Sequence, residues 1–267
     1  MKFTVFTKPY KDEIPALGKR VAALGVEGIE LPVRPGYPVT MDNAAIELPK
    51  AAKTLREESG ISIESIAPSF TSDGAELTPR LFEACGKAGI PIIRVCPTPR
   101  EGESYPDAEK RWQKLFLGMV PALESHNVAI GIQNHSGRNV PVHAFGLRSL
   151  LAPLPAKSIG AVWDAAHNAL EGESAGFALE LIYGPYFKML NLKNGYKKRS
   201  DDGKWKTFWC KGDEGLSDWK AVAENLKKRG FNGTVCLTAE YSEASGVEKY
   251  LAADIAYAKR LFAKTGN

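Results

Sequence analysis

The sequence lacks the features that would place it in a membrane or export it. No apolar stretch among the 267 residues approaches the roughly 18 residues that a membrane-spanning helix needs. The opening segment Met1–Thr7 is short and is followed at once by Lys8, Pro9 and further charged residues, so it does not resemble a signal peptide. We therefore predict a cytoplasmic protein with no membrane partner, and interpret the opening segment as a first strand.

Cysteine is scarce and forms no recognisable pattern. The four cysteines show neither a C-x-x-C pair nor the spacing of metal ligands; they are Cys85, Cys96, Cys210 and Cys236. We expect free, buried thiols. Nothing in the sequence pairs a cysteine with a base, so a nucleophilic cysteine is poorly supported.

A broad basic surface is also missing. The net charge is +4, and residues 193–211 alone contain seven basic residues against two acidic ones. This local excess is not the extended cationic face that a duplex-binding protein needs, so we predict no nucleic-acid partner. The segment is a cationic loop in this interpretation, either attracting a small anionic ligand or simply solvated.

What is present is a regular alternation of strand-like and helix-like segments. Helical stripes such as the apolar positions of residues 112–123 lie between short apolar runs, and Gly25, Gly60, Gly89 and Gly230 mark helix–strand junctions. The expected strands are Phe3–Thr7, Gly28–Leu31, Ile61–Ala67, Pro91–Val95, Val128–Gln133, Ile159–Asp164, Phe187–Lys193 and Thr234–Glu240.

Eight such units favour a closed barrel over an open sheet. The glycine-rich dinucleotide fingerprint is missing after the first strand, where Lys8-Pro9-Tyr10 stands, and no shift in composition suggests a linker. We predict an α/β fold of one domain, residues 1–267, forming a single (β/α)8 TIM barrel.

Polar residues end five of the expected strands. They are Glu30, then Gln133-Asn134-His135, Asp164 with His167, Asn191 with Lys193, and Glu240. The carboxyl ends of barrel strands form the active-site face, so these side chains should share one pocket. Two-residue periodicity would place Cys236, Thr238 and Glu240 on one face of the last strand. Asp164, Glu240 and a histidine would suit a divalent metal.

Across nearly its whole length the sequence resembles the xylose isomerase-like TIM barrels, a superfamily of sugar phosphate isomerases and epimerases. The motifs that carry the resemblance occur in the family's order. They are Gly25-Val26-Glu27-Gly28-Ile29-Glu30-Leu31, Gln133-Asn134-His135, Trp163-Asp164-Ala165-Ala166-His167, Asn191-Leu192-Lys193-Asn194, Gly212-Asp213-Glu214-Gly215-Leu216-Ser217-Asp218 and Leu237-Thr238-Ala239-Glu240-Tyr241.

The resemblance implies a metal site. Members similar to the ketose 3-epimerases bind the ion with Glu, Asp, His and Glu, which correspond here to Gln133, Asp164, Asn191 and Glu240. The amide of Gln133 replaces a carboxylate and that of Asn191 replaces an imidazole, which leaves four oxygen ligands and one fewer base. Such a site would take Mn²⁺ or Mg²⁺ in preference to Zn²⁺.

The function that follows is a sugar or sugar-derivative isomerase or epimerase, working by metal-assisted proton transfer next to a carbonyl. Glu240 is the preferred base, and Lys193, His167, His135 or Glu30 would supply the second acid or base. Lys193 would alternatively stabilise an enolate. Candidate substrate-binding residues are Glu30, Arg94, His135 and Trp209.

Structural roles compete with each of these assignments. Glu30 would pair with Arg34 or Arg94, His135 would orient a loop, and His167 would donate to a carboxylate.

Three other functions remain open. A lyase or dehydratase acting on a keto-sugar or keto-inositol would use the same enolate chemistry. The changes at Gln133 and Asn191 favour a sugar-binding barrel that has lost catalysis. A DNA-repair endonuclease of the same fold fits worst, because four histidines are few for its trinuclear zinc site. The substrate is expected to be a small carbohydrate; its identity and the formation of a homo-oligomer are left open.

Overall fold

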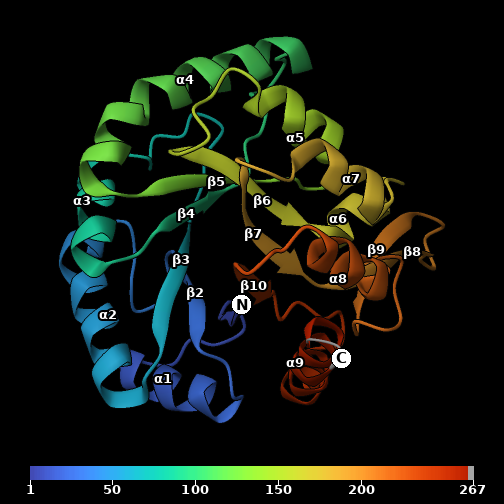
Figure 1. Ribbon diagram of the computed structural model, residues 1–267, viewed down its shortest axis with the longest axis horizontal. Helices are drawn as coiled ribbons and strands as arrows, with labels where there is room; N and C mark the ends of the chain where they lie inside the picture. Colours follow the sequence, from blue (N-terminus) through green and yellow to red (C-terminus); the bar gives the residue numbers. More distant parts are fainter. Residues whose placement is uncertain (264–267) are drawn as a thin grey trace.

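The computed structural model describes residues 1–263. Eight parallel strands close into a barrel in the spatial order β1-β10-β7-β6-β5-β4-β3-β2 (Figure 1). They are β1 (Lys2–Phe6), β2 (Gly28–Val33), β3 (Ser62–Pro68), β4 (Ile92–Val95), β5 (Ala129–Gln133), β6 (Ile159–Asp164), β7 (Phe187–Leu192) and β10 (Thr234–Leu237). The predicted single (β/α)8 TIM barrel is confirmed.

The helices wrap the outside of this barrel (Figure 1). They are α1 (Ile14–Ala23), α2 (Ala44–Ser59), α3 (Pro79–Ala88), α4 (Tyr105–His126), α5 (Ala144–Leu151), α6 (Ala165–Leu170), α7 (Ala175–Ile182), α8 (Trp219–Lys228) and α9 (Val247–Phe262), with a short 3₁₀ turn η1 (Ala244–Gly246). Within residues 1–263, no helix is both long and apolar enough to cross a membrane.

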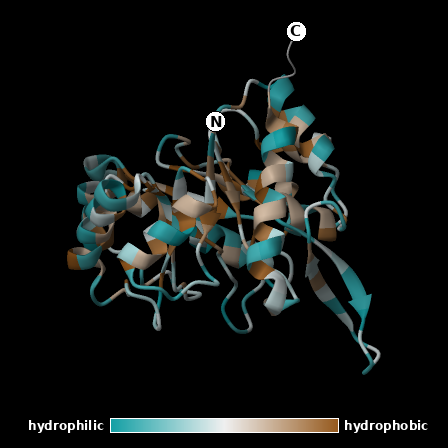
Figure 2. Cartoon of the chain, turned by 90° about the horizontal axis from the view of Figure 1, so that it is seen from below, coloured by the Kyte–Doolittle hydropathy of each residue, from teal (hydrophilic) through white to brown (hydrophobic). Residues whose placement is uncertain are grey.

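The sequence pattern explains how strands and helices pack. Every residue of β2, β4 and β6 is buried, as expected for parallel strands covered by helices. Figure 2 shows the hydrophobic residues gathered at the centre and the hydrophilic ones outside. Gly60 and Gly89 end α2 and α3 with positive φ angles of 66° and 71°, so the predicted helix–glycine–strand junctions are found there.

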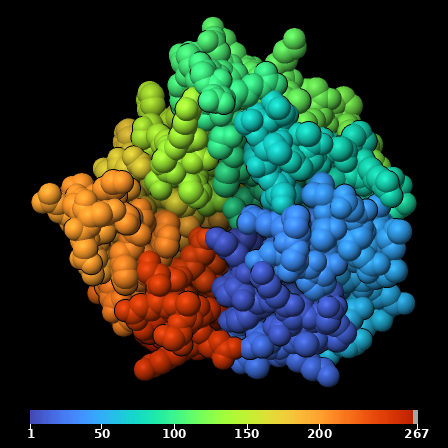
Figure 3. Space-filling view, turned by 180° about the vertical axis from the view of Figure 1, so that it is seen from behind, coloured from blue at the N-terminus to red at the C-terminus, as the bar shows by residue number. Residues whose placement is uncertain are grey.

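Closure of the barrel brings its first and last strands together. Strand β1 pairs in parallel with β10, in a register that matches Thr4 with Cys236. The first and last thirds of the sequence are therefore neighbours, as the adjoining blue and red surfaces in Figure 3 show. This pairing places the loop after β1 beside the loop after β10, and both loops contribute to the site described below.

The cationic segment is a hairpin, where we predicted a loop. β8 (Asn194–Arg199) and β9 (Trp205–Cys210) pair antiparallel and project from the barrel (Figures 1 and 2). The turn is closed by the Ser200 N–H bonded to the Lys204 carbonyl at 2.9 Å, with Gly203 at a φ of 78°. The Asp-Asp-Gly turn and the aromatic and β-branched residues within 205–209 were the available signals.

The last barrel strand is shorter than predicted. β10 ends at Leu237, and Ala239 adopts a left-handed φ of 52°, so the chain turns before Glu240. The predicted shared face of Cys236, Thr238 and Glu240 is therefore wrong, because two-residue alternation holds only within a strand. Glu240 reaches the barrel mouth from a loop.

Candidate functional site

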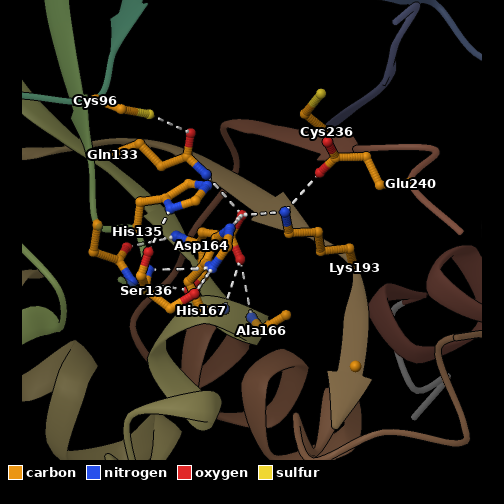
Figure 4. A network of polar contacts seen from close by, with 12 residues as sticks. Cys96, Gln133, His135, Ser136, Asp164, Ala166, His167, Lys193, Cys236 and Glu240 are labelled. Atoms are coloured by element: carbon orange, nitrogen blue, oxygen red, sulfur yellow. Dashed lines mark hydrogen bonds and ion pairs between the residues drawn. The ribbon is translucent and has the colours of Figure 1, made fainter. Parts of the chain in front are cut away.

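A buried polar cluster fills the carboxyl ends of the barrel strands. It contains an arginine, a lysine, three carboxylates and two histidines within an otherwise apolar core, and Figure 4 shows its central part. Its members are Glu30, Arg94, Gln133, His135, Asp164, His167, Asn191, Lys193 and Glu240. The structure thus brings together the residues that the sequence predicted for one pocket.

The deepest part of the cluster is an ion pair between β2 and β4. Arg94 Nε donates to Glu30 Oε1 at 2.8 Å, and the Ser65 hydroxyl donates to the same oxygen at 3.0 Å. Burial opposes the charge of Arg94, but the Glu30 carboxylate outweighs it and raises the pKa of the arginine. Two residues proposed for substrate binding are therefore engaged with each other, the structural role that the sequence also allowed for Glu30.

Gln133 connects this pair to the next strand. Its amide oxygen accepts from Arg94 Nη1 and lies 3.3 Å from the Cys96 Sγ, while its Nε2 donates to Asp164 Oδ2 at 2.8 Å. The amide orientation is thus set by a donor on one side and an acceptor on the other. A glutamate at this position would place a second carboxylate against Asp164.

Asp164 is held from several directions at the end of β6. Its Oδ1 caps α6 by accepting from the backbone N–H groups of Ala166 and His167 at 3.1 and 3.0 Å. Its own backbone exchanges hydrogen bonds with the Asn134 side chain at 2.8 and 3.0 Å. Burial raises the pKa of Asp164, and the charge of Lys193 opposes this shift.

Lys193 places its ammonium group between the two carboxylates that the sequence singled out. Lys193 Nζ lies 2.6 Å from Glu240 Oε2 and 3.7 Å from Asp164 Oδ2 (Figure 4). Lys8 binds the other oxygen of Glu240 at 2.5 Å. Burial disfavours each charge, but mutual attraction prevails: the pKa of Lys193 is raised and that of Glu240 is lowered. Both groups are ionised at neutral pH.

The rings of His135 and His167 lie against each other beside this ion pair, tilted by 34°. Their ring centroids lie 3.7 Å apart, and Trp209 from the hairpin meets His167 edge-on and lies 4.1 Å from Lys193 Nζ. The Ser136 N–H donates to His167 Nδ1 at 3.2 Å. Burial and the charge of Lys193 hold the pKa of His167 well below its ordinary value. A neutral ring that accepts at Nδ1 carries its proton on Nε2.

The predicted metal ligands lie together but do not fit a divalent ion as arranged. No group of three or more His, Cys, Asp or Glu side chains suited to a metal occurs in residues 1–263. The Gln133 oxygen is directed to Arg94, and Lys193 neutralises the carboxylates. Asn191 is buried, and neither its oxygen nor its nitrogen has a partner in the described chain. An ion would have to displace or repel the ammonium group.

The sequence analysis did not identify two residues that contact the polar cluster, Lys8 and Ser136. Lys8 was noted only as a charged residue after the first strand, although the rule that strand ends carry function applies there too. Ser136 orients His167 but carries no motif of its own. The remaining predicted residues, His135 and Trp209, lie against His167.

These features place the chain in a family. The profile of the xylose isomerase-like TIM barrel family matches residues 19–261, so the protein belongs to this family, as its sequence motifs indicated. None of the curated protein sequences matches the chain.

Solved structures of isomerases and related enzymes share the fold at low sequence identity. A D-psicose 3-epimerase from Clostridium cellulolyticum H10, solved with D-tagatose, is 14% identical with a TM-score of 0.74, over 99% of this chain and 100% of that one. The IOLI protein, solved with a zinc atom, is 13% identical with a TM-score of 0.79 over both whole chains. The probable 3-DHS dehydratase AsbF from Bacillus anthracis is 14% identical with a TM-score of 0.74, over 96% and 98%.

Proposed function

We propose that this protein is an isomerase or epimerase that moves a proton next to the carbonyl of a sugar or sugar derivative. The observation that carries the proposal is the Lys193 ammonium beside the ionised Glu240 carboxylate and the neutral His167. A fixed cation, a carboxylate and a neutral acid in one buried pocket are the groups that enolate chemistry requires. The family and the sugar epimerases among its structural neighbours support the same class.

The proposed reaction proceeds through an enolate of the substrate. The substrate carbonyl oxygen accepts a hydrogen bond from Lys193 in place of Glu240. The freed carboxylate then takes the proton from the adjacent carbon, and the electron pair of the broken C–H bond moves onto the carbonyl oxygen as an enolate. Lys193 stabilises this negative charge. In an epimerisation, a proton from solvent returns to the opposite face of the same carbon, the electron pair moves back to re-form the carbonyl, and Glu240 releases the proton that it took. In an isomerisation, Glu240 returns its proton to the neighbouring carbon, while His167 Nε2 gives its proton to the former carbonyl oxygen and takes the proton of the neighbouring hydroxyl in exchange.

In this proposal Lys193 provides the positive charge that the sequence assigned to Mn²⁺ or Mg²⁺. The support is its position between Asp164 and Glu240. We expect added Mn²⁺ or Mg²⁺ to leave the melting temperature unchanged, and EDTA to leave deuterium exchange unchanged. The double variant Q133E/K193M, which restores a carboxylate and removes the competing cation, should gain a melting shift with Mn²⁺. A shift for the wild-type protein would instead favour a resident metal.

One observation favours a second candidate, a sugar-binding barrel without catalysis. Glu240 is held by Lys8 as well as Lys193, and this double pairing keeps its pKa low. A carboxylate stabilised so strongly is a weak base until a substrate displaces one lysine.

Deuterium exchange distinguishes these functions. Ketoses and keto-sugar derivatives are incubated with the protein in D₂O and followed by NMR. We expect deuterium at the carbon beside the carbonyl, with the rate lowered at least ~100-fold in Lys193→Met. Lys188→Met is the control, because Lys188 lies near the amino end of β7, whereas Lys193 follows its carboxyl end. Binding without exchange would indicate a sugar-binding barrel, and loss of water would indicate a dehydratase.

A further inference from the structure

A cavity of about 400 Å³ adjoins the cluster on the side of β2 to β5. Its size suits a molecule as large as a monosaccharide derivative. Residues at or beyond the carboxyl ends of the strands line it, and they include Arg34, Ser69, Arg94, Thr98, His135 and Asn139. Two of these lining residues contact the cluster: His135 packs against His167, and Arg94 binds Gln133.

Among the described residues, those that line the cavity include two arginines and no carboxylate. Arg94 is committed to Glu30 and Gln133, as described above. Arg34, the first residue after β2, donates only its Nε, to the Ala67 carbonyl at 3.1 Å. No acidic side chain in residues 1–263 lies within 4.0 Å of the Arg34 guanidinium, which leaves its two terminal nitrogens available.

Both guanidinium groups are positioned by the same aromatic ring. Their central carbons lie 5.7 Å (Arg34) and 4.8 Å (Arg94) from the centroid of the Phe6 ring. Burial lowers the pKa of Arg34, and the neighbouring charge of Arg94 lowers it further. A cation that is desolvated, repelled by a second cation and aimed into a cavity is stabilised when an anion enters.

We infer that the substrate carries a carboxylate or phosphate group, and that Arg34 binds it in this cavity. The inference rests on the proposed function, since it places the anionic group of the same substrate away from Lys193. The planar terminal edge of Arg34 suits two parallel hydrogen bonds to an oxyanion. Ser69, Thr98 and Asn139 offer neutral groups for sugar hydroxyls. A neutral sugar would leave the Arg34 charge without a partner.

Equilibrium binding by calorimetry tests this inference without requiring catalysis. The probes are gluconate, glucose 6-phosphate, inorganic phosphate and the neutral sugar fructose. We expect gluconate or glucose 6-phosphate to bind about 10- to 100-fold more tightly than fructose, and Arg34→Gln to remove that preference. The stronger of the two anionic probes identifies the source of the oxyanion. Inorganic phosphate shows whether the anionic group binds without the sugar.

Two variants and a control keep the result interpretable. Arg34→Lys retains the charge but loses the forked geometry, so it should recover only part of the preference. Arg148→Gln is the control, because Arg148 also lies over an aromatic ring, Tyr186, but outside the cavity.

Equal affinity for anionic and neutral probes, or an unchanged preference in folded Arg34→Gln, would overturn the anionic substrate. Lys193→Met should keep the anion preference while losing exchange. Failure of the proposed reaction is thereby separated from failure of the binding site.

Discussion

The barrel mouth contains two ion-paired groups that differ in depth and in what surrounds them. The Arg94–Glu30 pair is closed off: the side chains are 8% and 0% exposed, and Phe6 and Ser65 pack against it. The Lys193–Glu240 pair opens to solvent on one side, since the Glu240 side chain is 21% exposed and Lys8 approaches from outside. We therefore expect the inner pair to stabilise the fold and, under the proposed function, the outer pair to exchange one partner for a substrate.

Asp164 joins the two groups. Gln133 accepts a hydrogen bond from Arg94 and donates one to Asp164, and Asp164 in turn faces Lys193. The comparison therefore makes distinct predictions for the inner pair, the outer pair and the residue between them.

The largest effect is expected from breaking the inner pair. Arg94→Met leaves the Glu30 carboxylate buried without a cation, which should lower the free energy of unfolding by about 3–5 kcal/mol. Urea denaturation followed by circular dichroism measures this loss. The double variant E30L/R94M should recover part of it, because no uncompensated charge remains. A small loss in the single variant would mean that the inner pair is not the rigid element of the mouth.

Asp254 forms no ion pair with the residues in 1–263, and it sharpens the comparison. Asp254 on α9 accepts hydrogen bonds from the Gly212 N–H and the Tyr241 hydroxyl, both at 2.8 Å. Burial raises the pKa of Asp254 to about 6, with Asp213 adding to the shift and Lys211 opposing it.

Folding therefore favours the protonated form of Asp254, so its stabilisation is complete below the unfolded pKa and is lost as the pH rises through about 6. The free energy of unfolding of the wild-type protein should fall between about pH 4 and pH 7 by roughly 2–3 kcal/mol more than that of Asp254→Asn. Urea denaturation of both proteins at the two pH values measures this difference. A parallel pH dependence in the two proteins would show that Asp254 ionises as readily folded as unfolded.

Two substitutions of Asp164 should lower the free energy of unfolding by a smaller amount, and their comparison distinguishes its role as a helix cap from that of its charge. Asp164→Ala removes the cap of α6 and the acceptor for Gln133, at a cost of about 1–2 kcal/mol. Asp164→Asn keeps an oxygen for the cap and should lose less stability, while the proposed proton-transfer activity falls in both variants. Thermal unfolding and the deuterium-exchange rate measure the two effects. Equal destabilisation by both changes would indicate that the charge, not the cap, stabilises this strand end.

The smallest effect on stability is expected at the outer pair. Lys8 is 46% exposed, so Lys8→Met should change the free energy of unfolding by less than ~1 kcal/mol, and less at high salt. Denaturation at two salt concentrations measures it. A loss comparable to that of Arg94→Met would remove the distinction between inner and outer pairs.

Much of the site was predictable because chain direction and strand periodicity are local properties. Polar residues at the ends of apolar strands, such as Asp164 and Lys193, had to gather at one face once eight parallel strands were recognised. The partner of Glu30 was not predictable, since the sequence offered both Arg34 and Arg94. The structure pairs Glu30 with Arg94, which leaves Arg34 directed toward the cavity. The assignments of catalytic, substrate-binding and metal-ligating roles stay predictions.

By itself, the sequence determined the barrel and the face on which the polar cluster lies, because hydrophobic periodicity decides which residues each strand buries and where it ends. Only the tertiary structure decided which charges meet. Closure of β1 onto β10 brings Lys8 to Glu240 across 232 positions, and the reach of one long side chain places an ammonium group where a metal ion was expected. Such contacts depend on distances of a few ångströms between side chains, and the separation of two residues along the chain does not predict those distances.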